Sequence, residues 1–101
     1  QAQFVKNHLG PVLANDHPGT KIIGFDHNKD HVVAWASGLY ADPEARSYFD
    51  GIGVHWYGGL NTHNLDTTHD IAPEKFILGT EACEGFLPYS QVYIPHPHSI
   101  Q

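Results

Sequence analysis

The chain has 101 residues, of which 41% are hydrophobic, and a formal charge of −6 with its nine histidines neutral. This composition excludes a disordered chain and argues against a nucleic-acid-binding surface, and the length is enough for one small domain with a modest core. Cys83 is the single cysteine, which excludes an internal disulfide and a thiolate zinc cluster, and no apolar stretch approaches the roughly 20 residues of a membrane span.

The first predicted element is a helix. Apolar residues at positions 5, 9, 12 and 13 have helical spacing, and Pro11 is expected to kink the helix or restart it. Because Gln1 stands inside this pattern, the sequence is expected to be a piece of a longer chain. A turn over 15–19 separates the helix from a first strand at about 21–26.

Two helices are predicted before the second strand. Asp30 is the expected N-cap of the first of them. Its predicted buried face consists of Val32, Trp35, Ala36 and Leu39. Asp42 and Pro43 have the sequence of a second helix start, with Asp as the cap and Pro at the first helical position. A strand over about 51–57 is expected to follow.

The rest of the chain contains one further predicted strand. The polar segment from Gly58 to Thr68 is interpreted as a loop with room for a helical turn, and the third strand is expected at about 76–81. Strand starts lie roughly 25–30 residues apart without hairpin turns, which favours parallel strands and right-handed crossovers. The predicted fold class is therefore α/β, and residues 92–101 are expected to form an irregular tail.

Each predicted strand ends in a polar side chain two residues after a glycine. The pairs are Gly24 and Asp26, Gly53 and His55, and Gly79 and Glu81. Because side chains alternate along a strand, each pair is expected to share one face. The polar side chains then gather at the C-terminal edge, where parallel sheets and barrels have their active sites. Three parallel strands alone leave two open edges, which supports the interpretation as a fragment.

Glu81 is the leading catalytic candidate. A carboxylate at the end of an apolar strand can be a nucleophile at an anomeric carbon or a general acid/base, and a salt bridge or cap is the structural alternative. His55 and Tyr57 are expected on the face of Gly53, where a tyrosine hydroxyl can orient a neighbouring carboxylate. For His55 a structural role is the alternative. Trp56 is expected to join the core that faces the helices.

A metal-binding module is the alternative from another functional class. His27 and His31 have the i, i+4 spacing that can bind a metal on a helix, but His27 would precede the helix and a third ligand is not evident. The surroundings of Cys83 match no cysteine-protease signature, so a buried, inert thiol is expected there. Neither a G-x-S-x-G elbow nor a phosphate-binding glycine-rich loop occurs, and no cofactor is predicted.

Several segments between about Phe4 and Gly85 resemble the acid β-glucosidases, or glucosylceramidases, of glycoside hydrolase family 30. They are Leu9-Gly10-Pro11 with Leu13-Ala14-Asn15, Asp42-Pro43-Glu44-Ala45, Gly51-Ile52-Gly53-Val54-His55-Trp56-Tyr57 and Thr80-Glu81-Ala82-Cys83. The last two, in this order and spacing, are the most specific. The resemblance implies a partial (β/α)8 TIM barrel whose strands correspond to about the fifth to seventh, with residues 1–91 belonging to the catalytic domain.

The resemblance also implies an activity and a site. Family members hydrolyse glucosylceramide to glucose and ceramide with retention, which requires two carboxyl groups about 5–5.5 Å apart. Glu81 matches the nucleophile. The substrate-binding candidates are Tyr57, His55, Asn28 and Asp26. The acid/base glutamate is expected upstream of Gln1, so the isolated 101 residues are expected to be inactive.

Partners and location are implied by the resemblance alone. The implied partners are glucosylceramide or a related β-glucoside, the remainder of the barrel, a β-domain and, through the lipid substrate, a membrane surface. The implied location is lysosomal or secreted. A related retaining β-glycosidase with another sugar substrate is the alternative, because the specificity loops of such barrels lie largely outside this chain.

Overall fold

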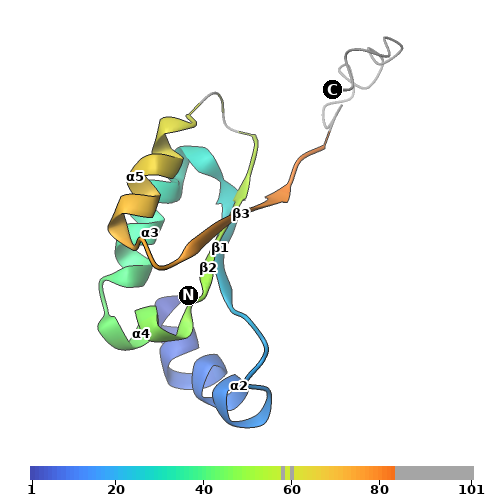
Figure 1. Ribbon diagram of the computed structural model, residues 1–101, viewed down its shortest axis with the longest axis vertical. Coiled ribbons are helices and arrows are strands. Elements are labelled where there is room, and N and C mark those ends of the chain that lie inside the picture. The colour runs from blue at the N-terminus through green and yellow to red at the C-terminus, as the bar shows by residue number, and fades with distance from the viewer. Residues whose placement is uncertain (58, 60, 84–101) are drawn as a thin grey trace.

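A computed structural model describes residues 1–57, 59 and 61–83. At its centre is a sheet of order β1-β2-β3, formed by β1 (Ile23–Asn28), β2 (Gly51–His55) and β3 (Phe76–Glu81) (Figure 1). Both neighbouring pairs are parallel, so the predicted α/β class with parallel strands is confirmed. The predicted tail over 92–101 and the domain boundary at residue 91 lie outside the described residues.

Helices cover one face of this sheet. α3 (Val32–Tyr40) and α4 (Pro43–Tyr48) connect β1 to β2, and α5 (His63–Ile71) connects β2 to β3. α3 and α5 pack side by side on the same side of the sheet (Figure 1). The core between helices and sheet includes Val32, Ala36, Leu39, Phe49, Ile52 and Val54. Among the described helices, none is long and apolar enough to cross a membrane.

α5 occupies the segment that the sequence predicted as a loop. Its inward side consists of Leu65, Thr68 and Ile71, and Thr68 is the most deeply buried of them. A threonine at the centre of a short stripe, with polar residues on the other positions, leaves only a weak helical period in the sequence. The helix forms because α3 provides the apolar surface against which this narrow stripe packs.

The N-terminal helical segment contains a π-helical turn. α1 (Ala2–Phe4) continues into η1 (Val5–Leu9) and α2 (Gly10–Asp16), and the Gly10 amide donates to the carbonyl oxygen of Val5. Pro11 has no amide hydrogen, and its ring would collide with a carbonyl of the preceding turn in a continuous α-helix. The wider π-helical turn accommodates both the missing amide hydrogen and the bulk of the proline ring. The predicted interruption therefore takes the form of a π-turn directly before Pro11.

A short 3₁₀ turn, η2 (Lys29–His31), precedes α3. Asn28 is in extended backbone and is the N-cap position of this turn, so Asp30 lies inside the turn. The prediction of Asp30 as an N-cap is therefore wrong. Its carboxylate lies 3.4 Å from Nε2 of His31 instead.

Both tryptophans are more exposed than the sequence predicted. Trp35 is 44% exposed, and its ring centroid lies 5.7 Å from that of Phe25. Trp56 is 49% exposed, because β2 ends at His55 and strand alternation no longer directs the next side chain toward the helices. The prediction that Trp56 belongs to the helix-facing core is therefore wrong.

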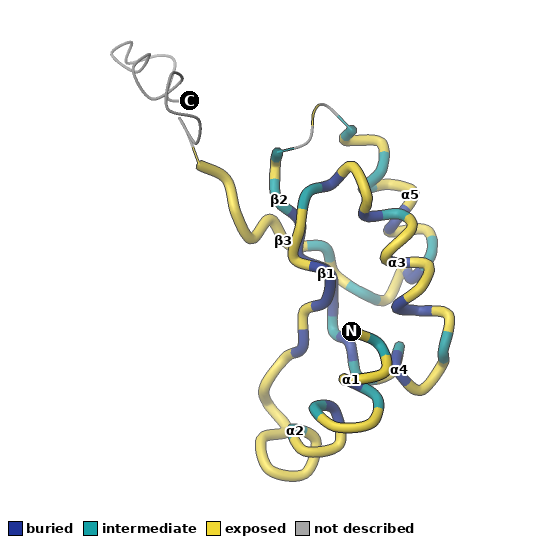
Figure 2. Tube along the Cα trace, turned by 180° about the vertical axis from the view of Figure 1, so that it is seen from behind, coloured by how far each residue is buried: buried dark blue, intermediate teal, exposed yellow. Residues whose placement is uncertain are grey.

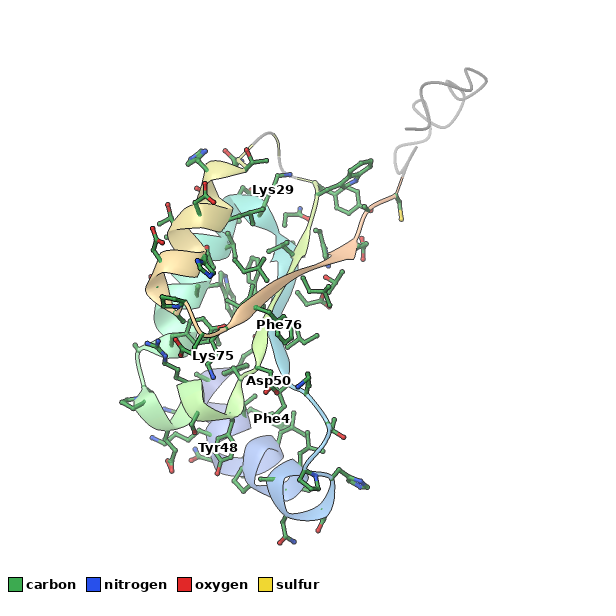
Figure 3. The ribbon with its side chains drawn as sticks, in the orientation of Figure 1. Phe4, Lys29, Tyr48, Asp50, Lys75 and Phe76 are labelled. Carbon is green, nitrogen blue, oxygen red and sulfur yellow. The ribbon has the colours of Figure 1, made fainter. Side chains whose placement is uncertain are left out.

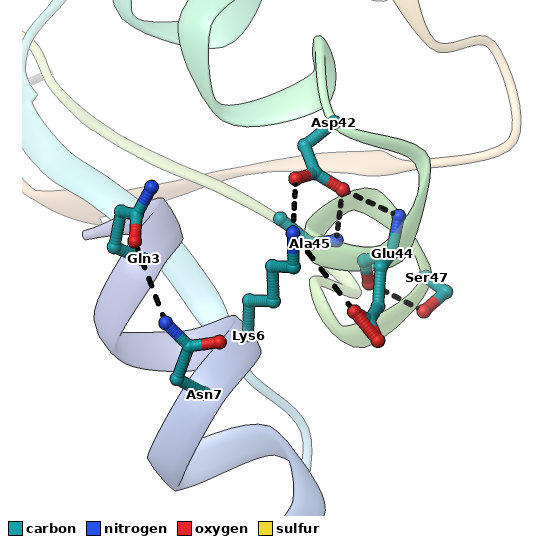
Figure 4. Close-up of polar contacts among 7 residues, drawn as sticks. All are labelled: Gln3, Lys6, Asn7, Asp42, Glu44, Ala45 and Ser47. Carbon is teal, nitrogen blue, oxygen red and sulfur yellow. Dashed lines mark hydrogen bonds and ion pairs between the residues drawn. The ribbon is translucent and has the colours of Figure 1, made fainter.

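α4 begins as predicted, with Asp42 as its cap. One carboxylate oxygen, Oδ1, accepts hydrogen bonds from the amides of Glu44 and Ala45 at 2.8 and 3.3 Å. The other, Oδ2, lies 2.7 Å from Nζ of Lys6 (Figure 4). Lys6, with the two amides, holds the pKa of Asp42 below its usual value. One carboxylate thus caps α4 and ties it to the N-terminal helical segment.

The face of the sheet opposite the helices is uncovered in the part of the chain that the structure describes. Large apolar side chains project from it: Ile23, Phe76 and Leu78 are 38%, 37% and 48% exposed. Phe76 lies against the bare backbone of Gly51, where a Cβ atom would collide with its ring. Figure 3 shows Phe76 on the side away from α3 and α5, and Figure 2 shows how exposed β3 is. Apolar side chains layered over such a face are typical of a barrel interior.

An ion pair joins α4 to the turn before β3. Nε and Nη2 of Arg46 donate to the two carboxylate oxygens of Glu74 at 2.8 and 2.7 Å, and this contact lowers the pKa of Glu74 to about 2. A carboxyl group whose pKa is lower in the folded state than in the unfolded state adds stability above its unfolded value. That contribution is lost as the pH falls from about 4.5 toward about 2.

We therefore expect Arg46→Met to lower the urea midpoint of unfolding slightly at pH 7, and by less at about pH 3.5. Urea titrations at both pH values measure the difference from the wild type. Lys21→Met, at an exposed position, controls for the loss of one positive charge. A difference that is the same at both pH values would contradict the assigned role of Glu74.

Candidate active site

A β-bulge in β1 turns Asp26 toward the open face of the sheet. Phe25 pairs with Gly53 and His27 pairs with Val54, so Asp26 is an extra residue between them. Phe25 and Asp26 have φ angles of 69° and 56°, in the left-handed region that residues other than glycine rarely adopt. The strand therefore changes direction directly before its last residues.

The prediction that Gly24 and Asp26 share a face is wrong. A Cβ atom at Gly24 would lie 2.8 Å from the ring of Phe49, in the core under the helices. Oδ1 of Asp26 instead lies 3.0 Å from Nε2 of His55, on the open face. Strict alternation assumes a regular strand, and the extra residue breaks it.

A second bulge, in β3, has the same effect on Glu81. Val54 pairs with Gly79 and His55 pairs with Glu81, so Thr80 is the extra residue. Glu81 is thus aligned with His55, whereas Gly79 is aligned with Val54 in the helix-facing layer. The prediction that Gly79 and Glu81 share a face is also wrong. The bulge nevertheless brings Glu81 to the same edge as the other strand-end side chains.

Asp26, His55, Thr80 and Glu81 form one contiguous polar cluster. Nε2 of His55 lies 3.0 Å from Oδ1 of Asp26 and 3.8 Å from Oε1 of Glu81. Oγ1 of Thr80 donates a hydrogen bond to the same Asp26 oxygen at 2.7 Å. The contacts from Thr80 and His55 hold the pKa of Asp26 below its usual value. Asp26 is therefore ionised at neutral pH, and its carboxylate lies within hydrogen-bond distance of both the Thr80 hydroxyl and Nε2 of His55.

The two carboxylates of this cluster are more exposed than the histidine between them. The side chains of Asp26 and Glu81 are 63% and 50% exposed, whereas that of His55 is 14% exposed. A ligand that approaches the C-terminal edge of the sheet therefore meets the carboxylates first. An accessible carboxylate beside an imidazole is suited to nucleophilic attack or to acid/base catalysis.

The ring of Tyr57 lies next to that of His55. The two ring centroids are 6.2 Å apart in an edge-on arrangement, and the Tyr57 hydroxyl accepts a hydrogen bond from the Cys83 amide at 2.8 Å. The Cys83 side chain and burial raise the pKa of Tyr57 to about 12, and the negative charge of Glu81 adds to this shift. Tyr57 is therefore a neutral phenol near the carboxylate. Cys83 is exposed, so the prediction of a buried thiol is wrong.

Asn28 and His27 border the cluster. Asn28 pairs with His55 at the end of β1, and the His27 ring centroid lies 6.2 Å from that of His55. The side chain of His31 is 67% exposed. Within residues 1–57, 59 and 61–83, no group of three or more His, Cys, Asp or Glu side chains is arranged to hold a metal ion. The metal-binding alternative on His27 and His31 therefore has no support in this part of the chain.

Two residues of the site were not identified from the sequence, Thr80 and Lys29. Lys29 is only 7% exposed, and its Nζ donates to the carbonyl oxygen of Trp56. Its own carbonyl oxygen accepts a hydrogen bond from Nδ2 of the Asn64 side chain at 3.1 Å. Figure 3 shows Lys29 near the end of the sheet at which α5 begins. A cavity of about 530 Å³ is lined by Lys29, Thr80 and Glu81 among others. No motif marks a lysine at this position, and the contribution of Thr80 depends on the bulge.

Comparisons with known proteins agree over most of the chain. Residues 1–93 match the family described as Glycosyl hydrolase family 30 TIM-barrel domain. Two Caenorhabditis elegans proteins, Putative glucosylceramidase 1 and Putative glucosylceramidase 3, are 44% and 41% identical over 85% and 82% of this chain. The Lysosomal acid glucosylceramidase of Mus musculus is 35% identical over 84% of it. Each alignment covers 17% of the relative.

A solved structure is similar as well. The crystal structure of SrfJ from Salmonella typhimurium has a TM-score of 0.76 and 30% identity, over 81% of this chain and 19% of that protein. The chain thus spans less than a fifth of the length of these relatives.

Proposed function

Because this chain belongs to the TIM-barrel domain of glycoside hydrolase family 30, we propose that it forms part of the active site of a retaining β-glucosidase. In this proposal Glu81 is the nucleophile. The three parallel strands form part of the family's barrel, and the face that carries Ile23, Phe76 and Leu78 is the face directed to the barrel interior.

The observation that carries the proposal is the position of Glu81. It stands at the C-terminal end of β3, the end at which TIM barrels have their active sites. Its carboxylate is half-exposed and lies 3.8 Å from Nε2 of His55. We propose that His55 and the neutral phenol of Tyr57, whose ring lies beside that of His55, orient this carboxylate and leave it accessible to a sugar.

In the proposed reaction a carboxylate oxygen of Glu81 attacks the anomeric carbon, and the aglycone oxygen leaves with a proton from a second carboxyl group. Water then attacks the glycosyl-enzyme and releases β-glucose. The two carboxyl groups of a retaining enzyme lie about 5–5.5 Å apart, and the second is supplied by a part of the enzyme other than these residues. We propose that the sugar is bound by Tyr57, His55, Asn28 and Asp26.

The proposed substrate is glucosylceramide or a closely related β-glucoside. Three relatives that align with most of this chain are named glucosylceramidases. A lysosomal or secreted location is part of the same proposal, in keeping with the name of the mouse relative. A lipid substrate would bring the enzyme into contact with a membrane surface, and the remaining barrel and a β-domain are the partners proposed within the parent chain.

The stereochemistry of the product tests this proposal. For the longer enzyme that carries this segment, we expect proton NMR to detect β-glucose before α-glucose when glucosylceramide or an aryl β-glucoside is hydrolysed. α-Glucose as the first product would contradict a retaining mechanism. Aryl β-galactosides and β-xylosides serve as matched substrates, and faster hydrolysis of either would favour the alternative of another sugar substrate.

A further inference from the structure

The extra residues of the two bulges touch each other across the middle strand. Oγ1 of Thr80 donates to Oδ1 of Asp26 at 2.7 Å and also lies 3.4 Å from the carbonyl oxygen of Val54. Gly53 makes room for this contact, because a Cβ atom there would lie 2.9 Å from Cγ2 of Thr80. A hydroxyl from one outer strand is thus bonded to a carboxylate from the other, above a bare position of β2.

We propose that Thr80 is a positioning residue for the nucleophile: its hydroxyl, bonded to Asp26, holds the bulge of β3 that presents Glu81 to His55. This inference rests on the proposed function of Glu81 as the nucleophile. Thr80 itself does not contact the reacting atoms.

The register of the sheet explains why the bulge matters. Gly79 is aligned with Val54 in the helix-facing layer. In a regular strand the side chain two residues later would return to that layer, and Glu81 would face the helices. The extra residue moves Glu81 into line with His55 instead. A bulge interrupts the ladder of backbone hydrogen bonds, so a side-chain hydrogen bond to a charged group is a suitable means of holding it.

Asp26 connects this bulge to the imidazole beside Glu81. The same oxygen, Oδ1, receives the Thr80 hydroxyl and lies 3.0 Å from Nε2 of His55. A change in the Thr80 contact therefore acts on the nucleophile by two routes, through the backbone of β3 and through the orientation of the His55 ring. The other carboxylate oxygen, Oδ2, is the one that we propose for the contact of Asp26 with the sugar.

Thr80→Val keeps the shape of the side chain and removes the hydroxyl. In the longer enzyme we expect kcat to fall by between about tenfold and a hundredfold, because a displacement of about 1 Å at a reacting group has effects of this size. KM should change by less than about twofold, because the substitution alters orientation rather than binding. Thr80→Ser restores the hydroxyl, and its kcat should stay within about threefold of the wild type.

Thr67→Val is the matched control. Oγ1 of Thr67 bonds to the carbonyl oxygen of His63 at 3.3 Å on α5, away from the cluster, so its removal should leave kcat unchanged.

A double-mutant cycle is a second test. Because Thr80 acts through Asp26, adding Thr80→Val to Asp26→Ala should cause no further fall in kcat beyond that of Asp26→Ala alone. If Thr80→Val lowers the soluble yield, Thr80→Ala removes the same hydroxyl with a smaller side chain and should lower kcat by a similar factor.

The outcomes separate this inference from the function on which it rests. A normal kcat for Thr80→Val or Thr80→Ala, together with an inactive Glu81→Gln variant, would overturn the positioning role and leave the proposed function intact. An equal loss in Thr80→Val and Thr80→Ser would overturn it too, because the hydroxyl would not be responsible. An active Glu81→Gln variant would overturn the proposed function itself.

Discussion

Replacing Glu81 by glutamine is expected to lower kcat of the enzyme that carries this segment by at least about 10⁴-fold. Glutamine has nearly the same shape, but its amide cannot form the glycosyl-enzyme. Because the side chain is 50% exposed, the substitution should leave Tm and soluble yield unchanged. The measurement is the rate of nitrophenol release from a nitrophenyl β-glucoside and of glucose release from glucosylceramide.

Glu44→Gln is the matched control for this experiment. Glu44 lies on α4, its side chain is 58% exposed, and its carboxylate is 4.0 Å from Nζ of Lys6. The same change of a glutamate to an amide at this position should leave kcat and KM at the wild-type values. Turnover by Glu81→Gln at the rate of the Glu44→Gln control would show that Glu81 is not the nucleophile.

Phe49→Ala is expected to cause the largest loss of stability, about 3–5 kcal/mol in the free energy of unfolding. Phe49 is 1% exposed, and its ring meets that of Tyr40 edge-on with centroids 6.5 Å apart. It also fills the space over the backbone of Gly24. Truncation removes this buried area and leaves a cavity between the sheet and the helices. Urea unfolding at pH 7 measures the change.

Phe4→Ala is the control for the loss of a phenyl ring. Phe4 is 54% exposed, so its truncation should cost less than about 1 kcal/mol. Similar losses for both variants would contradict the assignment of Phe49 to the core and of Phe4 to the surface.

The strands of this protein could be predicted from the sequence because each is an apolar run with glycine and polar residues at fixed places. β3 is found at the predicted residues, and β1 is shifted by two residues from the expected 21–26. α4 was predictable from Asp42 and Pro43, since a cap and a helix start depend on neighbouring residues only. α5 was not, because its burial depends on the surface of α3.

The faces of the ends of the two outer strands, β1 and β3, could not be predicted. A period of two requires a regular strand, and both outer strands contain an extra residue at the site. Nothing in the sequence around Phe25 signals its positive φ angle, which is rare for a bulky side chain. The bulges therefore reversed two predicted faces, and the same bulges brought Asp26 and Glu81 to His55.

The candidate site was predicted in part. Glu81, His55 and Tyr57 stand at strand ends, so local sequence was sufficient to identify them as candidates. Thr80 contributes only because β3 bulges, and Lys29 only because the chain after β2 returns over it. Contacts between residues this far apart in the chain follow from tertiary structure and have no local signal.

If Glu81 is the nucleophile, it forms a covalent bond with the sugar, and that intermediate can be trapped. The longer enzyme would be incubated with a mechanism-based fluoroglucoside, digested, and its peptides analysed by mass spectrometry. We expect one added fluoroglucosyl group on Glu81 and none on the Glu81→Gln variant. A fluoroglucosyl group on any other carboxylate, with Glu81 unmodified, would contradict it.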